Sequence, residues 1–396
     1  MLSLVISIAT GSGTHEVKLG EKARLKAEID SDTQMLCGAL AMSSRMYSAS
    51  DAVESLTSGR LPPSRKDLRH RHYLPLEPSH RVANLEYMRT GILLPFGAHN
   101  VYFNEPNRSL FSPKGEWLQR DFDDPIKCWD IDEVIKSGNA HGASREDLYG
   151  CLYFHVSDQL YEFADRLSRF DISLNILGRD AVELSSSIKK GDLTSQFGIP
   201  SSIRFDRIDV SNIVDEHYKI GIAGVIDAWG DFLKPDKEAT IIGHFTNWSG
   251  KDVDAEPNGH NCDAEALFTI AQNKGRLPDL IPPELKTAKS LAPKNRDRLR
   301  ALMSMVTAMT HTMITSVYDN SRAFDRYLLN YGLDDALKRN KLKRKTKHTI
   351  VPHRLCASVH DPPSALPEFK DKDSWYLHSR IHSMTWTERY IEICRS

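Results

Sequence analysis

Two apolar stretches of this 396-residue chain lead into polar residues whose types could bind a ligand. The first covers residues 170–177, where Ile and Leu alternate with polar residues as in a strand, and the second covers the β-favouring residues 203–210. Ligands of open parallel sheets collect outside the carboxyl ends of the strands. The candidate binding residues are therefore those at the ends of the two stretches, namely Asp180 and Ala181 after the first and Asp209, Ser211 and Asn212 at the second.

These residue types suit recognition of a nucleoside cofactor and an amine. The Asp180 carboxylate can accept a hydrogen bond from an adenine amino group, and the small Ala181 leaves room for the base to pack. Asp209 and Asn212 can hold a substrate amine or the amino and carboxylate groups of a methionine moiety, because an amide side chain both donates and accepts.

A structural role explains the same residues equally well. Asp and Asn often cap the turn between a strand and a helix by hydrogen-bonding to nearby backbone groups. The sequence alone leaves both interpretations open for Asp180, Asp209 and Asn212.

The pattern around these stretches predicts a parallel βαβ unit. An amphipathic helix is expected over residues 144–169, opened by Ser144 and Asp147 at capping-box spacing, and it feeds the strand 170–177. A connection then reaches the strand that ends at Asn212. Because this strand and the strand before Asp180 are expected to be parallel neighbours, their ends should face one crevice.

The rest of the chain predicts a Rossmann-like α/β protein with a partly parallel sheet, a helical insertion and a helical C-terminal region. Residues 1–79 form an N-terminal segment with a strand at 4–9, a Gly11-Ser-Gly13 turn that is either a simple turn or a binding loop, and a helix over 21–56. Residues 80–277 are expected to form the α/β core, with a helix that ends at Gly91, a helix over 221–233 and a strand over 240–248. Residues 278–396 begin with a proline-rich connector, continue from Asn295 in a methionine-rich helix whose methionines are expected to fill the core, and pack on the core.

Composition and motifs exclude several function classes. The formal net charge is −1, so no global field attracts nucleic acid or an anionic membrane. The six cysteines lack Cys-x-x-Cys spacing, which predicts reduced thiols and no metal site. No apolar run is long enough to span a membrane, and hydrolase, P-loop, metalloprotease and kinase signatures are missing. We expect a cytoplasmic protein; the basic run 338–347 is either a solvated helix end or a nuclear-localisation or nucleic-acid patch.

Several motifs together resemble known proteins. Gly178 to Ala181 followed by Phe205 to Ile208 looks like the third- and fourth-strand region of Rossmann-like S-adenosylmethionine methyltransferases. More specifically, the chain resembles an uncharacterised fungal family whose N-terminal domain of unknown function is similar to that of dynein axonemal assembly factor three. The segments that carry this second resemblance are residues 89–97, 103–111, 148–150, 205–212 and 349–354.

The resemblance implies a methyltransferase-like core and two alternative functions. In the first, S-adenosylmethionine is the cofactor of a methyl transfer, although the chain departs from the family in its first 60 residues, where Thr14 follows Gly13 and the expected Asn-Asp strand end is missing. This departure suggests a truncated or replaced segment and a degenerate enzyme. The alternative is a non-catalytic assembly or scaffold factor that acts through an unidentified protein partner.

Overall fold

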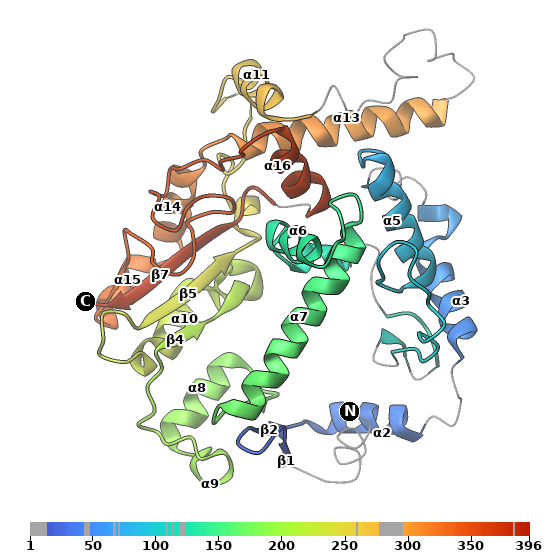
Figure 1. Ribbon diagram of the computed structural model, residues 1–396. Helices are drawn as coiled ribbons and strands as arrows, with labels where there is room; N and C mark the ends of the chain where they lie inside the picture. The colour runs from blue at the N-terminus through green and yellow to red at the C-terminus, as the bar shows by residue number, and fades with distance from the viewer. Residues whose placement is uncertain are drawn as a thin grey trace. The chain divides into compact units, whose positions relative to one another are not determined.

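The computed structural model describes residues 14–42, 48–65, 69, 72–107, 110–112, 114–118, 124–258, 260–276, 296–382 and 385–396. Contacts divide the chain into two compact units. Unit 1 comprises Met1–Gly178, Leu280–Met305 and Arg380–His382, and unit 2 comprises Arg179–Asp279, Val306–Ser379 and Ser383–Ser396. Each unit combines helices with one small mixed sheet, so the protein is mixed α/β (Figure 1).

Unit 1 contains a three-stranded sheet and a set of helices. The order of the sheet is β1-β2-β3, with β1 antiparallel and β3 parallel to β2. The elements are β1 (Thr14–Lys18), β2 (Arg24–Glu28), α2 (Ser31–Met42), α3 (Ala49–Arg60), η1 (Pro63–Arg65), α5 (Pro78–Thr90), η3 (Pro125–Cys128), α6 (Ile131–Ala140), α7 (Leu148–Arg169) and β3 (Ser173–Leu177).

The long helix α7 begins where Asp147 caps its first turn. The Asp147 carboxylate accepts hydrogen bonds from the backbone N–H of Gly150 at 2.9 Å and of Phe96 at 2.7 Å. A Cβ atom at position 150 would overlap this carboxylate, so a larger residue there would have to displace the Asp147 side chain. The cap is therefore Asp147 itself and not the predicted Ser144, because the chain enters the helix three residues later than the capping-box spacing suggests.

Unit 2 contains a four-stranded sheet and its helices. The elements are α8 (Ala181–Lys190), α9 (Thr194–Phe197), β4 (Arg207–Asp209), η4 (Ser211–Val214), η5 (Glu216–Tyr218), α10 (Gly221–Trp229), η6 (Gly230–Phe232), β5 (Thr240–Phe245), η7 (Trp248–Lys251), α11 (Ala264–Lys274), α13 (Arg296–Ser316, whose residues from Val306 belong to this unit), α14 (Ser321–Asn330), α15 (Leu333–Arg339), β6 (Leu342–Arg344), α16 (Lys372–Tyr376) and β7 (Arg389–Arg395). A further helical segment, η11, spans Leu377–Ile381.

The order of the second sheet is β4-β5-β7-β6 (Figure 1). β4 and β5 are parallel and are joined through α10, whereas β7 is antiparallel to both of its neighbours, β5 and β6. The C-terminal region was expected to be helical, yet it supplies β6 and β7. Its apolar positions Ile391 and Ile393 are completely buried, and β7 forms because it pairs with β5 on one side and with β6 on the other.

The two faces of this sheet differ in chemistry because side chains alternate along each strand. The apolar face carries Phe245, Ile391 and Ile393, and Phe245 packs edge-on against Phe324 of α14 with ring centroids 5.0 Å apart. The register places most of the polar side chains on the opposite face, which we call the polar face; they are Arg207, Asp209, Thr240, His244, Tyr390 and Glu392. Arg389 is an exception, since it is buried on the apolar face as the register partner of Phe245.

The expected neighbourhood of the two parallel strands is wrong. β3 pairs with β2 in one sheet and β4 pairs with β5 in another, so within the described sheets the two strand ends do not share an edge. The predicted helix over 21–56 is also interrupted by β2, whose Leu25 and Ala27 alternate with charged residues and pair on both sides. Long-range pairing overrides local helix propensity at this position.

Other predictions are confirmed. α5 ends before Gly91, which adopts φ +69, and β5 and α10 occupy the expected segments. The methionine-rich helix is α13, with Met309 and Met313 completely buried as core residues. The predicted strand 4–9, the Gly11–Gly13 turn and the connector 278–293 lie outside the described residues.

Candidate functional site

Three of the predicted residues lie together where β4 ends. The Asp209 carboxylate uses Oδ1 to accept the backbone N–H of Ser211 at 2.8 Å and is exposed to solvent. Ser211 opens η4 with φ +48, an uncommon backbone region for a residue other than glycine. The Asn212 side chain donates from Nδ2 to Tyr218 Oη at 3.1 Å and to Thr246 Oγ1 at 3.3 Å. Asn212 thereby connects the carboxyl end of β4 to that of β5.

A buried aspartate stabilises the contact between the segment after β4 and the segment after β5. Asp215 is completely buried, and its Oδ2 atom accepts the backbone N–H groups of Thr246 and Asn247, each at 2.8 Å. These two bonds hold the segment after β5 against the segment after β4. The geometry of Asn212 and Thr246 thus depends on Asp215, a residue that the sequence did not single out.

Asp180 and Ala181 lie elsewhere in the fold. Asp180 caps α8, since its Oδ1 accepts the backbone N–H of Val182 at 2.8 Å and of Glu183 at 3.2 Å, and Ala181 is the first residue of the helix. In the structure, the Asp180 side chain therefore has the capping role that was the alternative to ligand binding. The Oδ2 atom is not used by the cap.

A histidine, a glutamate and a tyrosine extend the site across β5 and β7. His244 and Tyr390 are register partners, and their rings stack with centroids 4.3 Å apart and planes at 7°. His244 Nε2 donates to Glu388 Oε2 at 2.8 Å, with 25% of the His244 side chain and 18% of the Glu388 side chain exposed. A carboxylate that holds one ring nitrogen of a histidine fixes the orientation and tautomer of the ring.

The tyrosine remains a proton donor at neutral pH. Burial raises the pKa of the Tyr390 phenol, and the negative charges of Glu388 and Asp209 raise it further. The register places Asp209 opposite Ile242, two residues before His244 and on the same face, so the end of β4 lies next to the His244 group. We call Asp209, Asn212, His244, Glu388 and Tyr390 the strand-end cluster.

The strand-end cluster offers acceptors and one acid–base group to a ligand. Asp209 Oδ2 and Asn212 Oδ1 are acceptors that the cap and the Tyr218 and Thr246 contacts leave available. A neutral His244 whose Nε2 carries the proton presents its Nδ1 lone pair. The only sequence signal for His244 was a polar residue within the apolar strand at 240–245, and nothing local indicated that Glu388 and Tyr390 would pair with it.

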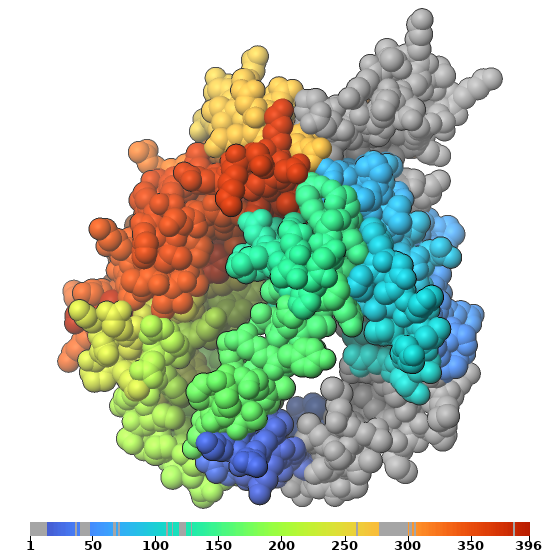
Figure 2. All heavy atoms as spheres, in the orientation of Figure 1, coloured from blue at the N-terminus to red at the C-terminus, as the bar shows by residue number. Residues whose placement is uncertain are grey.

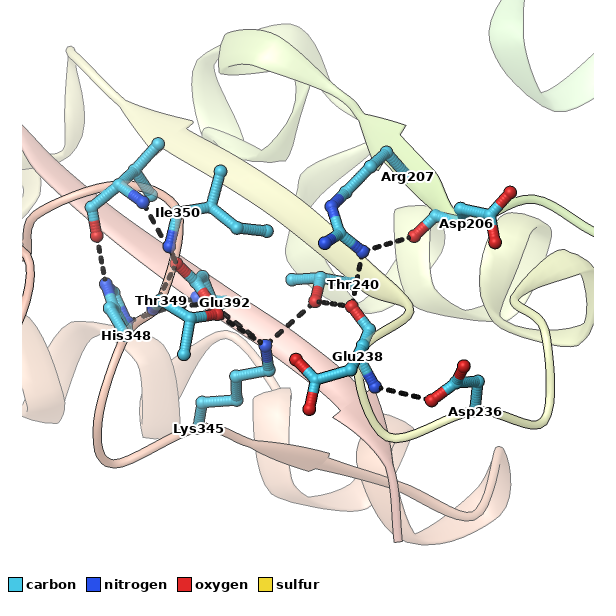
Figure 3. Close-up of polar contacts among 11 residues, drawn as sticks. Asp206, Arg207, Asp236, Glu238, Thr240, Lys345, His348, Thr349, Ile350 and Glu392 are labelled. Carbon is cyan, nitrogen blue, oxygen red and sulfur yellow. Dashed lines mark hydrogen bonds and ion pairs between the residues drawn. The ribbon is translucent and has the colours of Figure 1, made fainter.

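The polar face also contains a closed network around Glu392 (Figure 3). This completely buried carboxylate accepts the backbone N–H groups of Thr349, Ile350 and Val351 at 2.7 to 3.1 Å, and Lys345 Nζ contributes an ion pair at 3.1 Å. Burial alone would raise the pKa of Glu392, but the three N–H groups and Lys345 together lower it to about 2. The carboxylate is saturated with donors and so serves the fold rather than a ligand.

The same network continues toward the amino end of β5. Lys345 Nζ also donates to Thr240 Oγ1 at 2.9 Å, and that hydroxyl donates to the Glu238 carbonyl at 2.9 Å. Arg207 donates to the same carbonyl (Figure 3). Residues 349–351, the first half of the segment 349–354 that carries part of the family resemblance, thus supply the backbone N–H groups that bind Glu392.

The basic run 338–347 forms the end of α15 and the edge strand β6. Three of its bases are ion-paired within the chain, since Arg339 contacts Asp227, Arg344 contacts Asp325 and Lys345 contacts Glu392. Lysine is common on edge strands because it disfavours pairing with another chain.

Among the described residues, no group of three or more His, Cys, Asp or Glu side chains could hold a metal ion. In the same part of the chain, no helix combines the length and the apolar character that crossing a membrane requires.

Comparisons with family models, with curated proteins and with solved structures find no match to this chain.

Proposed function

We propose that the strand-end cluster binds a ligand that carries an ammonium group, with S-adenosylmethionine as the ligand and methyl transfer as the reaction that the family resemblance implies. Asp209 and Asn212 hold the amino group of the methionine moiety in this proposal. The resemblance also implies Asp180 and Ala181 as adenine contacts. These two residues lie at the start of α8 and are not part of the strand-end cluster, so their contribution is tested separately, with Asp180 Oδ2 as the acceptor outside the helix cap.

One observation carries the proposal. Two parallel strands, β4 and β5, end side by side, and Asn212 bridges their ends next to the exposed carboxylate of Asp209. Ligands of open parallel sheets bind at such carboxyl ends. In this sheet the interior strand β7 is antiparallel to β5, and the edge strand β6 runs in the same direction as β4 and β5. A carboxylate oxygen and an amide oxygen together suit the three N–H donors of an ammonium group.

Isothermal titration calorimetry on the full chain tests the proposal. We expect heat with S-adenosylmethionine, and we expect Asp209→Asn to weaken binding by about 10-fold or more, because a hydrogen bond to a charged group contributes about 1.5–3 kcal/mol. Asp192→Asn removes the same charge from an exposed position after α8 and should leave binding unchanged. No heat at millimolar ligand, or equal binding by both variants, would refute the proposal.

The variant Asp180→Ala separates adenine contact from capping. Loss of S-adenosylmethionine binding with a retained melting temperature supports the contact. A lower melting temperature without an effect on binding leaves Asp180 with its capping role, for which a loss of about 1 kcal/mol is expected.

A second candidate function is a non-catalytic assembly or scaffold factor. The observation that favours it is the exposed apolar surface on the second half of α7, where Leu160 is 63% exposed, Tyr161 78% and Phe163 48%. The green atoms of α7 lie open on the face that Figure 2 shows. The absence of heat in the titration above would favour this function, because a scaffold needs no cofactor.

A further inference from the structure

The edge strand β3 differs from the other edges of the two described sheets. The four edge strands are β1, β3, β4 and β6. β1 carries Glu16 and Lys18, β4 is Arg-Ile-Asp and β6 is Leu-Lys-Arg, whereas β3 is Ser-Leu-Asn-Ile-Leu and has no charge. Soluble proteins guard exposed edges with charged residues, prolines or bulges. Among these four strands, only β3 has no charged residue that would disfavour pairing with another strand.

The apolar side of the three-stranded sheet becomes more exposed toward β3. The register places Ala27 and Leu25 of β2 beside Ile176 and Leu174 of β3. Ala27 is only 7% exposed, but Leu174 is 36% exposed and Ile176 57%. An apolar layer that is covered on one strand and open on the next ends at an edge that another strand could extend.

The sequence of β3 is complementary to itself in antiparallel register. If two copies pair with Asn175 on the two-fold axis, Leu174 of one copy lies opposite Ile176 of the other, and the reverse, on one face. Ser173 then lies opposite Leu177, and Asn175 lies opposite its own counterpart.

The residues that flank β3 add charge complementarity in the same register. Asp171 lies two residues before the strand and Arg179 two residues after it, so this register brings the Asp171 end of each copy to the Arg179 end of the other. Arg179 also donates to Ser187 Oγ within its own chain at 3.3 Å. A register shifted by one residue would place the Leu174 and Ile176 pair of one copy on the opposite face of the joint sheet from the same pair of the other copy, and it would lose this match of charges.

We propose that two copies of this chain associate through antiparallel pairing of their β3 strands, centred on Asn175, to form a continuous six-stranded sheet. The contact is isologous, as in most symmetric dimers. A five-residue strand buries little surface, so the dimer is expected at micromolar rather than nanomolar concentrations.

Sedimentation velocity of the full chain under reducing conditions tests association. We expect a concentration-dependent shift from 44.8 kDa to twice that mass between about 1 and 200 µM. Asn175→Lys places like charges directly opposite each other on the axis and should raise the dimer dissociation constant by roughly 2- to 5-fold, because such pairs are worth up to about 1 kcal/mol. Asn139→Lys adds the same charge at the exposed end of α6 and should leave the dimer intact.

Cysteine substitution tests the register. Asn175→Cys should form a disulfide between copies under mild oxidation, because Cβ atoms of directly opposed residues are about 4.5–5.5 Å apart. Ser173→Cys should not, since its counterpart lies four residues along the strand, roughly 13 Å away. The unsubstituted chain gives the background from its own cysteines.

A charge exchange completes the test. Asp171→Arg alone should weaken the dimer, and the double variant with Arg179→Asp should restore it. A chain that stays monomeric up to 200 µM, as expected if a different protein covers this edge, would overturn the proposal. So would a dimer that Asn175→Lys leaves unchanged, or cross-linking of equal yield at both cysteine positions.

Discussion

Replacing Glu392 by glutamine should strongly destabilise unit 2. The substitution preserves the size of the side chain but removes its charge. In the parent chain, backbone N–H groups donate to both carboxylate oxygens, so the amide N–H₂ of glutamine would place a donor against these donors. The substitution also leaves the largely buried Lys345 without its counter-charge. No change elsewhere on the polar face would remove as many contacts at once.

The magnitude follows from the pKa of this carboxyl group. Its fall from 4.5 to about 2 means that the donors favour the charged form by about 3 kcal/mol, at about 1.4 kcal/mol per pKa unit. Removing one partner of a buried pair costs about 3–5 kcal/mol. We therefore expect a loss of roughly 3–5 kcal/mol at pH 7, or about 6–20 °C in melting temperature for a unit of this size.

Thermal unfolding followed by tryptophan fluorescence measures this loss. Glu238→Gln is the matched control, because Glu238 lies in the same region with an exposed side chain, and its stability should stay within about 0.5 kcal/mol of the parent.

The pH dependence gives a second readout. The folded pKa of Glu392 lies below its unfolded value, so its contribution is complete above about pH 4.5 and is lost as the pH falls toward 2. The Glu392→Gln variant should therefore lose less stability than the parent in that range. A melting temperature within 1 °C of the parent at pH 7 would refute the reasoning.

Two further predictions concern a buried histidine and a glycine. Burial, and to a smaller extent the nearby His348, lowers the pKa of His353 from 6.5 to about 4. The unfolded chain therefore binds more protons than the folded chain below pH 6.5, and the free energy of unfolding should fall by up to about 3 kcal/mol between pH 6.5 and 4. His353→Phe keeps an aromatic ring and cannot be protonated, so urea titrations should show a smaller loss over this range; an equal loss would contradict the assignment. In unit 1, Gly150→Ala should displace the Asp147 cap and lower the free energy of unfolding by about 1–2 kcal/mol in the same urea titration. Gly142→Ala is the control, because its Cβ would meet no atom within 4 Å and any loss of stability would come only from the backbone strain at φ +87. A Gly150→Ala variant as stable as the parent would show that the cap can move freely.

The two proposals concern different units and fail independently. Ligand binding depends on Asp209 and Asn212 in unit 2, whereas dimerisation depends on β3 in unit 1. A monomeric chain that binds S-adenosylmethionine would keep the first proposal and remove the second. A dimer without ligand binding would do the reverse and would favour the scaffold function.

The position of the site was partly predictable. Polar residues that end an apolar stretch indicate a strand end, and Asp209, Ser211 and Asn212 do lie at the end of β4. The same pattern placed Asp180 after a strand, but it could not distinguish a helix cap from a ligand contact. Both roles use an aspartate at the point where a strand leads into a helix.

The remaining members of the strand-end cluster required the sheet itself. Glu388 and Tyr390 are more than 140 residues from His244, and only the antiparallel register of β5 and β7 brings them together. The same register buries Glu392 beneath the segment 349–351. Sequence periodicity carries no information about which distant strand will be the partner.

The amino-acid sequence by itself determined the local elements of this protein, such as the end of α5 at Gly91, the amphipathic α7 and the buried methionines of α13, because side-chain spacing and backbone preference act over a few residues. Only the tertiary structure decided that β3 and β4 belong to different sheets and that the C-terminal residues complete the second one. Strand pairing joins segments far apart in the chain, and its energy comes from contacts that no local pattern records.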